Sequence, residues 1–173
     1  MENIQLNHSA HKMSAEKYSL SLLVHDVTVP MNIGSIFRIA DALGVEKIYL
    51  TGHSLIPPNS KINKTSRSTE KYVPYTYEKD PIRILQNLKS VGYKIVSLEI
   101  TTASVAIEKF DAYPDDKICL ILGSESSGVS QQLLNESDAC VHIPMLGNNS
   151  SMNVATACAI AVYELTKKLG NRQ

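Results

Sequence analysis

The chain alternates between short, strongly apolar runs and stretches in which apolar positions follow a helical spacing. The apolar runs are rich in Leu, Ile and Val, which is typical of strands buried on both faces of a sheet. One further run alternates as a short edge strand would. We therefore expect strands at Ser19–Val27, Lys47–Thr51, Tyr72–Tyr77 (the edge strand), Tyr93–Ile100, Lys117–Leu122 and Ala139–Ile143.

Three segments between and after these runs carry helical signals. From Asn32 onward the apolar positions recur every three to four residues, and Gly44 is a natural stop. Asp80 can cap a second helix whose first position suits Pro81. The last helix is expected over residues 151–169, with lysines near its end.

Strands that alternate with helices predict an α/β fold, with a parallel sheet sandwiched by helices. The 173 residues fit one domain. Residues 1–18 are polar and are expected to form an N-terminal arm, so the domain itself is expected at residues 19–173.

The last helix has almost no polar face, because small and apolar side chains follow one another from Val154 to Val162. A helix that is apolar all round must be buried all round. Two explanations stay open on this pattern alone: the helix packs against a partner chain, or it is a central core helix.

The composition argues against a membrane-spanning protein and against one with a signal peptide. No apolar run approaches the roughly 20 residues that a membrane span needs, and the opening residues lack the basic and apolar regions of a signal peptide. Cys119, Cys140 and Cys158 are widely spaced and lie in apolar stretches, which favours reduced core thiols over disulfides or a metal site. We expect a cytoplasmic protein without a metal.

The formal net charge is +0, whereas many nucleic-acid-binding proteins are clearly basic. One stretch nevertheless concentrates positive charge, opposed only by Glu70. A solvated loop explains such a stretch, and an RNA-binding loop is the alternative. Its cations are Lys61, Lys64, Arg67 and Lys71.

The first segment with candidate chemistry is Asn32–Arg38, at the start of the first helix. Asn32, Ser35 and Arg38 are spaced i, i+3, i+6 and are expected on one flank. A polar flank at a helix N-terminus can bind an anion or a phosphate. The alternative is that Arg38 pairs with a nearby acid such as Asp41.

The second segment, Leu122–Val129, contains Gly123, Glu125 and Gly128 and directly follows an apolar strand. Ligands of open α/β sheets bind beyond the carboxyl ends of strands. The segment is neither a Walker loop nor a G-x-G-x-x-G fingerprint, so triphosphate or dinucleotide binding is not indicated. A plain strand-to-helix turn capped by Ser130 is the alternative.

The third segment, Ile143–Asn153, joins a strand that ends at Pro144 to the apolar last helix. Five consecutive residues, Gly147 to Ser151, are polar or glycine. A capped turn needs only one or two of these, so we expect a bound ligand here.

Together the three segments resemble the SpoU (also called TrmH) family of the SPOUT methyltransferases, over about residues 20–169. Two departures occur. Relatives often carry Ala-Leu-Gly-Ala where this chain has residues 64–71, and a further serine shortly after Asn153. The motifs, in the family's order and approximate spacing, are Asn32-Ile33-Gly34 with Arg38, Leu122-Gly123-Ser124-Glu125 with Gly128-Val129, and Ile143-Pro144-Met145 with Ser151-Met152-Asn153.

This resemblance implies an S-adenosylmethionine-dependent RNA methyltransferase that methylates a ribose 2′-hydroxyl of tRNA or rRNA. It also implies a C-terminal trefoil knot, which the general rule of unknotted chains would not predict. Family members form homodimers through the last helix and the first-motif helix, and the pocket is shared between the chains. A base-nitrogen methyltransferase and a non-catalytic RNA-binding protein of the same fold are the alternatives.

The resemblance further implies roles for single residues. Arg38 is the activating group, which we interpret as electrostatic because arginine is not normally deprotonated in proteins. Asn32, Glu125 and Asn153 shape the catalytic pocket, helped by Ser150 or Ser151, and the cationic stretch faces RNA. The cofactor would contact Leu122, Gly123, Glu125, Gly128, Ile143, Met145, Ser151 and Met152, with the strand end Leu98–Thr101 nearby.

Overall fold

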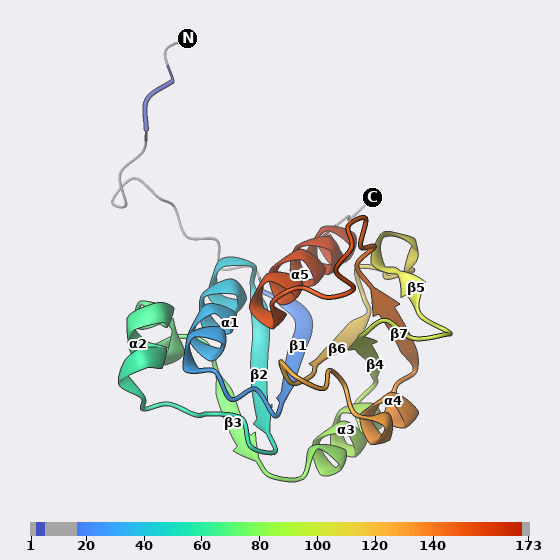
Figure 1. Cartoon of the computed structure of the whole chain (residues 1–173), viewed down its shortest axis with the longest axis horizontal. Coiled ribbons are helices and arrows are strands. Elements are labelled where there is room, and N and C mark those ends of the chain that lie inside the picture. Colours follow the sequence, from blue (N-terminus) through green and yellow to red (C-terminus); the bar gives the residue numbers. More distant parts are fainter. Residues whose placement is uncertain (1–2, 6–16, 171–173) are drawn as a thin grey trace.

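The computed structural model describes residues 3–5 and 17–170, so most of the expected polar arm at residues 1–18 lies outside the described residues. The described chain forms a seven-stranded sheet in the order β3-β2-β1-β6-β4-β7-β5, and its strand pairings are parallel (Figure 1). The strands are β1 (Tyr18–His25), β2 (Val45–Thr51), β3 (Tyr75–Glu78), β4 (Tyr93–Leu98), β5 (Val105–Ala106), β6 (Lys117–Leu122) and β7 (Ala139–His142).

Helices cover both faces of this sheet (Figure 1). α1 and α5 pack side by side on one face, and α3 and α4 lie together on the other. The helices are α1 (Pro30–Ala42), α2 (Ser60–Ser66), α3 (Pro81–Ser90), α4 (Gln131–Glu136) and α5 (Val154–Gly170), with short 3₁₀ turns η2 (Thr69–Lys71) and η3 (Ile107–Lys109).

The central strand β1 shows why its sequence reads as a continuous apolar run. Successive side chains of a strand point to opposite faces. Leu20 and Leu22 pack in the cluster formed with α1 and α5, whereas Leu23 packs with Leu85 of α3 and Leu133 of α4. Both faces are therefore cores, and the predicted doubly covered parallel sheet is confirmed.

Several element boundaries differ from the sequence expectation. α1 begins at Pro30 rather than Asn32, because the fixed backbone angle of proline suits the first helical position. The edge strand β3 covers Tyr75–Glu78 rather than Tyr72–Tyr77. The short elements α2, α4, β5, η2 and η3 were not expected, since none is long enough to show a clear periodicity.

α5 is only partly buried in the single chain. One face is buried against the sheet and α1 through residues such as Cys158 and Leu165. The opposite face leaves Ile160 and Tyr163 exposed in the single chain. The interpretation as a central core helix is therefore wrong. An apolar strip that contains Ile160 and Tyr163 remains exposed in the single chain.

The three cysteines are free thiols. Burial raises the pKa of Cys119 and of Cys158 to about 12, so both are unreactive core thiols, as predicted. Cys140 is half-buried. Among residues 3–5 and 17–170, no helix is long and apolar enough to cross a membrane.

Candidate active site

A cavity of about 670 Å³ opens at the carboxyl edge of the sheet, between the loops that follow β4, β6 and β7 and the first turn of α5. Its volume falls within the range of roughly 300–1,000 Å³ that is usual for small-molecule sites. All eight positions expected to contact a cofactor line this one cavity: Leu122, Gly123, Glu125, Gly128, Ile143, Met145, Ser151 and Met152.

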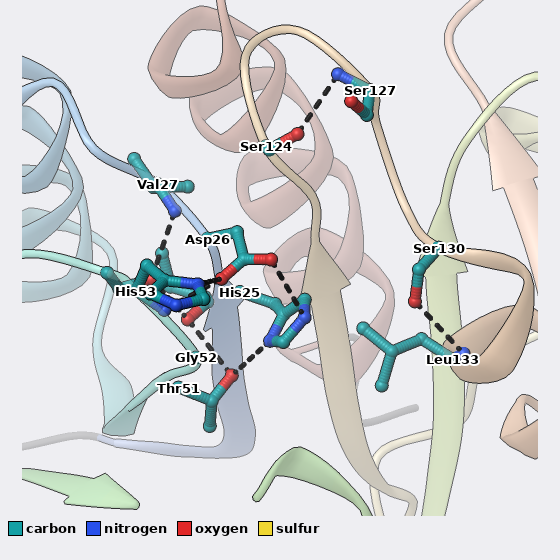
Figure 2. Close-up of polar contacts among 12 residues, drawn as sticks. His25, Asp26, Val27, Thr51, Gly52, His53, Ser124, Ser127, Ser130 and Leu133 are labelled. Carbon is teal, nitrogen blue, oxygen red and sulfur yellow. Dashed lines mark hydrogen bonds and ion pairs between the residues drawn. The ribbon is translucent and has the colours of Figure 1, made fainter. Parts of the chain in front are cut away.

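The loop after β6 is held closed by its own backbone. Ser124 and Gly128 exchange two backbone hydrogen bonds of 3.0 Å, and the Ser127 amide donates to the Ser124 hydroxyl (Figure 2). Ser130 also caps α4, because its hydroxyl accepts from the Leu133 amide. The capped-turn interpretation and the cavity-lining interpretation therefore both describe this loop.

Glu99, directly after β4, anchors that loop; the sequence analysis placed the segment Leu98–Thr101 near the cofactor but did not single out this residue. Its Oε2 accepts from the Val129 amide at 2.9 Å, and its Oε1 accepts from the Ile100 amide at 2.9 Å. Gly128 has φ +63°, and a Cβ there would lie 2.1 Å from Glu99 Oε2. The signal that could have found Glu99 is a lone acid directly after a buried strand.

Side chains from all three motifs meet at the rim of the cavity. Asn32 donates through Nδ2 to Glu125 Oε1 at 2.8 Å. Asn153 donates through Nδ2 to Asn32 Oδ1 at 2.9 Å. Asn153 Oδ1 in turn accepts from the amides of Ala155 and Thr156, and so caps the first turn of α5.

Glu125 is also bound by the N-terminus of α1. Its carboxylate accepts from the Val29 amide at 3.1 Å and from the Thr28 amide at 3.3 Å. Burial acts to raise the pKa of Glu125, but hydrogen bonds from Asn32, from its own backbone and from these two amides outweigh burial and hold the pKa below its ordinary value. A fixed negative charge therefore lies beside the cavity.

Arg38 does not join this network. It is exposed and forms neither a hydrogen bond nor an ion pair with the described residues, Asp41 included. Asn32 is buried. Each residue of an α-helix turns by about 100°, so side chains six positions apart point in directions that differ by about 120°. The expectation that Asn32 and Arg38 share one flank is therefore wrong.

The glycine of the first motif explains where α2 lies. A Cβ at Gly34 would be 2.7 Å from the Ile62 carbonyl oxygen and 2.7 Å from Thr65 Cβ. The absence of a side chain thus lets α2 pack directly on α1. Arg38 lies one turn beyond Gly34 and therefore on the same face of α1.

The cationic stretch is a helix and a following turn rather than the expected loop. Asn59 caps α2, because its Oδ1 accepts from the amides that begin the helix. Glu70 is bound by Asn63 and by the Ser66 hydroxyl rather than by a cation. The four cations are exposed and form no ion pair with described residues: Lys61, Lys64, Arg67 and Lys71.

These features define an α/β protein whose ligand pocket is built by the loops after neighbouring parallel strands. The model of the SpoU rRNA methylase family matches residues 19–163. The chain belongs to this family.

Similar proteins carry related names. A TrmH-family tRNA/rRNA methyltransferase of Staphylococcus saprophyticus is 27% identical over 159 residues, which cover 92% of this chain and 63% of the relative. The chain thus spans less than two thirds of that relative's length.

Solved structures show the same fold. The TrmH/SpoU tRNA modifying enzyme of A. aeolicus is 26% identical with a TM-score of 0.77, over 88% of this chain and 76% of that one. The SpoU methyltransferase AviRb of Streptomyces viridochromogenes, in complex with AdoMet, is 27% identical with a TM-score of 0.79, over 89% of this chain and 61% of that one.

Proposed function

We propose that this chain is an S-adenosylmethionine-dependent RNA methyltransferase that methylates a ribose 2′-hydroxyl of tRNA or rRNA. The observation that carries the proposal is the meeting of Asn32, Glu125 and Asn153, one from each motif, at the rim of the cavity. Membership of the SpoU family and similarity to an AdoMet-bound methyltransferase support it.

The cavity fits this cofactor in size and chemistry. Apolar side chains such as Ile143 and Met152 can enclose an adenine ring, and the glycine-bearing loop after β6 offers backbone groups. The carboxylates of Glu99 and Glu125 both line the cavity and complement a positively charged sulfonium. When bound, the cofactor supplies an activated methyl group.

The residues of the chain have two tasks in this reaction: to align the ribose and to ease loss of the hydroxyl proton. We assign the second task to Arg38, whose guanidinium stays charged. Arg38 holds the adjacent phosphate and lowers the pKa of the 2′-hydroxyl electrostatically. Asn32 and Glu125 fix the N-terminus of α1 against the cavity, and so set where Arg38 lies.

We further propose a C2 homodimer that covers the apolar strip of α5. Ala159, Ile160 and Tyr163 line a groove with Ile143 and Pro144, and this groove faces away from the core of the single chain. A C2 interface buries the same patch on both copies and makes each site twice. Arg38 of one copy would then act beside the cofactor of the other.

Two finer properties follow from the family. Membership of the SpoU family supports the family's trefoil knot in the C-terminal part. The free thiols and the RNA substrate support a cytoplasmic location.

Titration calorimetry with S-adenosylmethionine tests the proposal. We expect one binding site per chain for the wild type, and weaker binding for Met152→Lys, which places a positive charge in the cavity wall and repels the sulfonium. Absence of binding would contradict the proposal and favour a non-catalytic RNA-binding protein.

A further inference from the structure

A second polar cluster lies at the carboxyl ends of β1 and β2, outside the proposed cofactor cavity (Figure 2). Its centre is Asp26, which follows β1 and has φ +56°. Asp26 Oδ1 accepts from the His53 amide at 2.7 Å and lies 3.1 Å from His53 Nδ1. Asp26 Oδ2 lies 3.3 Å from Nε2 of His25. One carboxylate therefore orients two imidazole rings.

The cluster is anchored in the sheet on its inner side. His25 Nδ1 is 3.0 Å from the hydroxyl of Thr51, and the buried Thr51 hydroxyl donates to the Val24 carbonyl. Burial acts to raise the pKa of Asp26, but the hydrogen bonds from His53 and the neighbouring His25 outweigh burial and hold the pKa below its ordinary value. Asp26 is thus a charged, fixed support.

The outer side of the cluster is exposed although it is held in place. The His53 side chain is 80% exposed, yet Asp26 binds both its amide and its ring. Tyr77 of β3 is 46% exposed, and its hydroxyl donates to the carbonyl of Gly52, the residue before His53, at 2.8 Å. Two exposed rings are therefore already ordered, which is the property that lowers the entropic cost of binding.

The cluster is connected to the candidate active site through the chain segment 27–29. Residues 27–29 follow Asp26 directly. The Val27 amide donates to the hydroxyl of Ser54, the residue after His53. The Thr28 and Val29 amides bind Glu125 at the cavity rim. The same short segment thus contacts both the cluster and the cavity.

We propose that His53 and Tyr77 form a stacking surface for an unpaired base of the substrate RNA, beside the nucleotide that is methylated. The inference rests on the proposed function, and it names the part of the RNA that is recognised. Unpaired bases stack on tyrosine and histidine rings, and this contact tolerates different bases. Because Asp26 engages His53 Nδ1, Nε2 is left for the edge of a base. Lys79 is exposed, and its backbone carbonyl accepts a hydrogen bond from the Gly52 amide. Its side chain adds a positive charge that can contact the RNA backbone.

The test measures binding of bulk tRNA and, separately, of ribosomal RNA to the full chain. We expect His53→Ala and Tyr77→Ala each to weaken binding by roughly 5- to 100-fold, the usual effect of losing one stacked base. The salt dependence should stay unchanged, since no phosphate contact is lost. Tyr77→Phe keeps the ring without its tether and should fall between the wild type and Tyr77→Ala.

Tyr113→Ala is the matched control. Tyr113 is exposed and precedes β6, so it lies on the side of the amino ends of the strands, away from the cluster at the carboxyl ends, and its loss should leave RNA binding unchanged. Calorimetry with S-adenosylmethionine confirms that each variant is folded. If Tyr77→Ala fails this check, His53→Ala decides the question.

Wild-type RNA affinity in His53→Ala and Tyr77→Ala would overturn the stacking surface and leave the proposed function intact. A loss of binding that comes only with a flatter salt dependence would also overturn it, because it would indicate a phosphate contact. A wild type that binds S-adenosylmethionine but neither RNA would contradict the proposed function itself.

Discussion

Asn32 and Asn153 are separated by 121 positions in the chain, yet their side-chain amides meet at 2.9 Å. Asn32 accepts from Asn153 and donates to Glu125 at 2.8 Å. An amide side chain can do both at once, because its NH₂ group donates and its oxygen accepts. The pair therefore ties the start of α1 to the loop before α5 and, through Glu125, to the loop after β6.

Asn32→Ala should destabilise the protein and reduce methyl transfer. The substitution removes the hydrogen bonds that Asn32 makes with Glu125 and with Asn153, and a typical intramolecular hydrogen bond contributes about 0.5–1.5 kcal/mol to stability. Urea unfolding measures the change in the free energy of unfolding. Asn135→Ala is the control, because Asn135 is exposed and its side chain, among residues 3–5 and 17–170, bonds only to Gln131 on its own helix. Equal stability of the two variants would show that the Asn32 contacts are energetically unimportant.

The pKa of Glu125 predicts how its contribution to stability depends on pH. Because its folded-state pKa lies below the ordinary value of 4.5, its contribution is fully present above pH 4.5 and is lost as pH falls through the folded-state pKa. The difference in unfolding free energy between wild type and Glu125→Gln should therefore shrink as pH falls below 4.5. A difference that stays constant between pH 7 and pH 3 would argue against this charge.

Lys64→Glu with Arg67→Glu should weaken RNA binding and flatten its dependence on salt. Phosphate contacts release counterions, so fewer contacts give a shallower slope. Arg83→Glu with Lys89→Glu, on α3 at the other face of the sheet, changes the net charge equally and should leave the slope unchanged. Identical slopes for both double variants would show that α2 is only a solvated surface.

Ala159→Glu should give a folded monomer with little methyl transfer. Ala159 lines the uncovered groove of α5, so a carboxylate there is tolerated in the single chain but would be buried without a partner in the dimer. Sedimentation velocity at micromolar concentration measures the state of assembly, with Lys167→Glu on the exposed part of α5 as the control. An active monomeric wild type would refute the shared site.

Much of the fold could be predicted because a parallel sheet covered on both faces leaves a strong signal in each strand. The apolar runs of β1 and β6 show this, as does α3, where Asp80 caps the helix and Pro81 begins it. α2 could not be predicted, because Ile62 is its only buried apolar residue and the helix depends on packing against Gly34.

The candidate site likewise has residues that could be predicted from the sequence and residues that could not. The eight predicted cofactor positions lie in two local motifs, after β6 and after β7, so the sequence places them together once the strands are in order. Glu99 reaches the loop after β6 through the Val129 amide, and His53 is held in a turn by Asp26. Such contacts join single residues from separate loops, and no periodicity or spacing marks them in advance.

Nucleoside mass spectrometry tests the central claim most directly. Unmodified tRNA or rRNA is incubated with S-adenosylmethionine and either the wild type or Arg38→Ala, then digested to nucleosides. We predict a 2′-O-methylated nucleoside with the wild type and none with Arg38→Ala, while calorimetry shows nearly equal S-adenosylmethionine affinity, because Arg38 lies outside the cavity. A base-methylated nucleoside, or full activity of Arg38→Ala, would contradict the account.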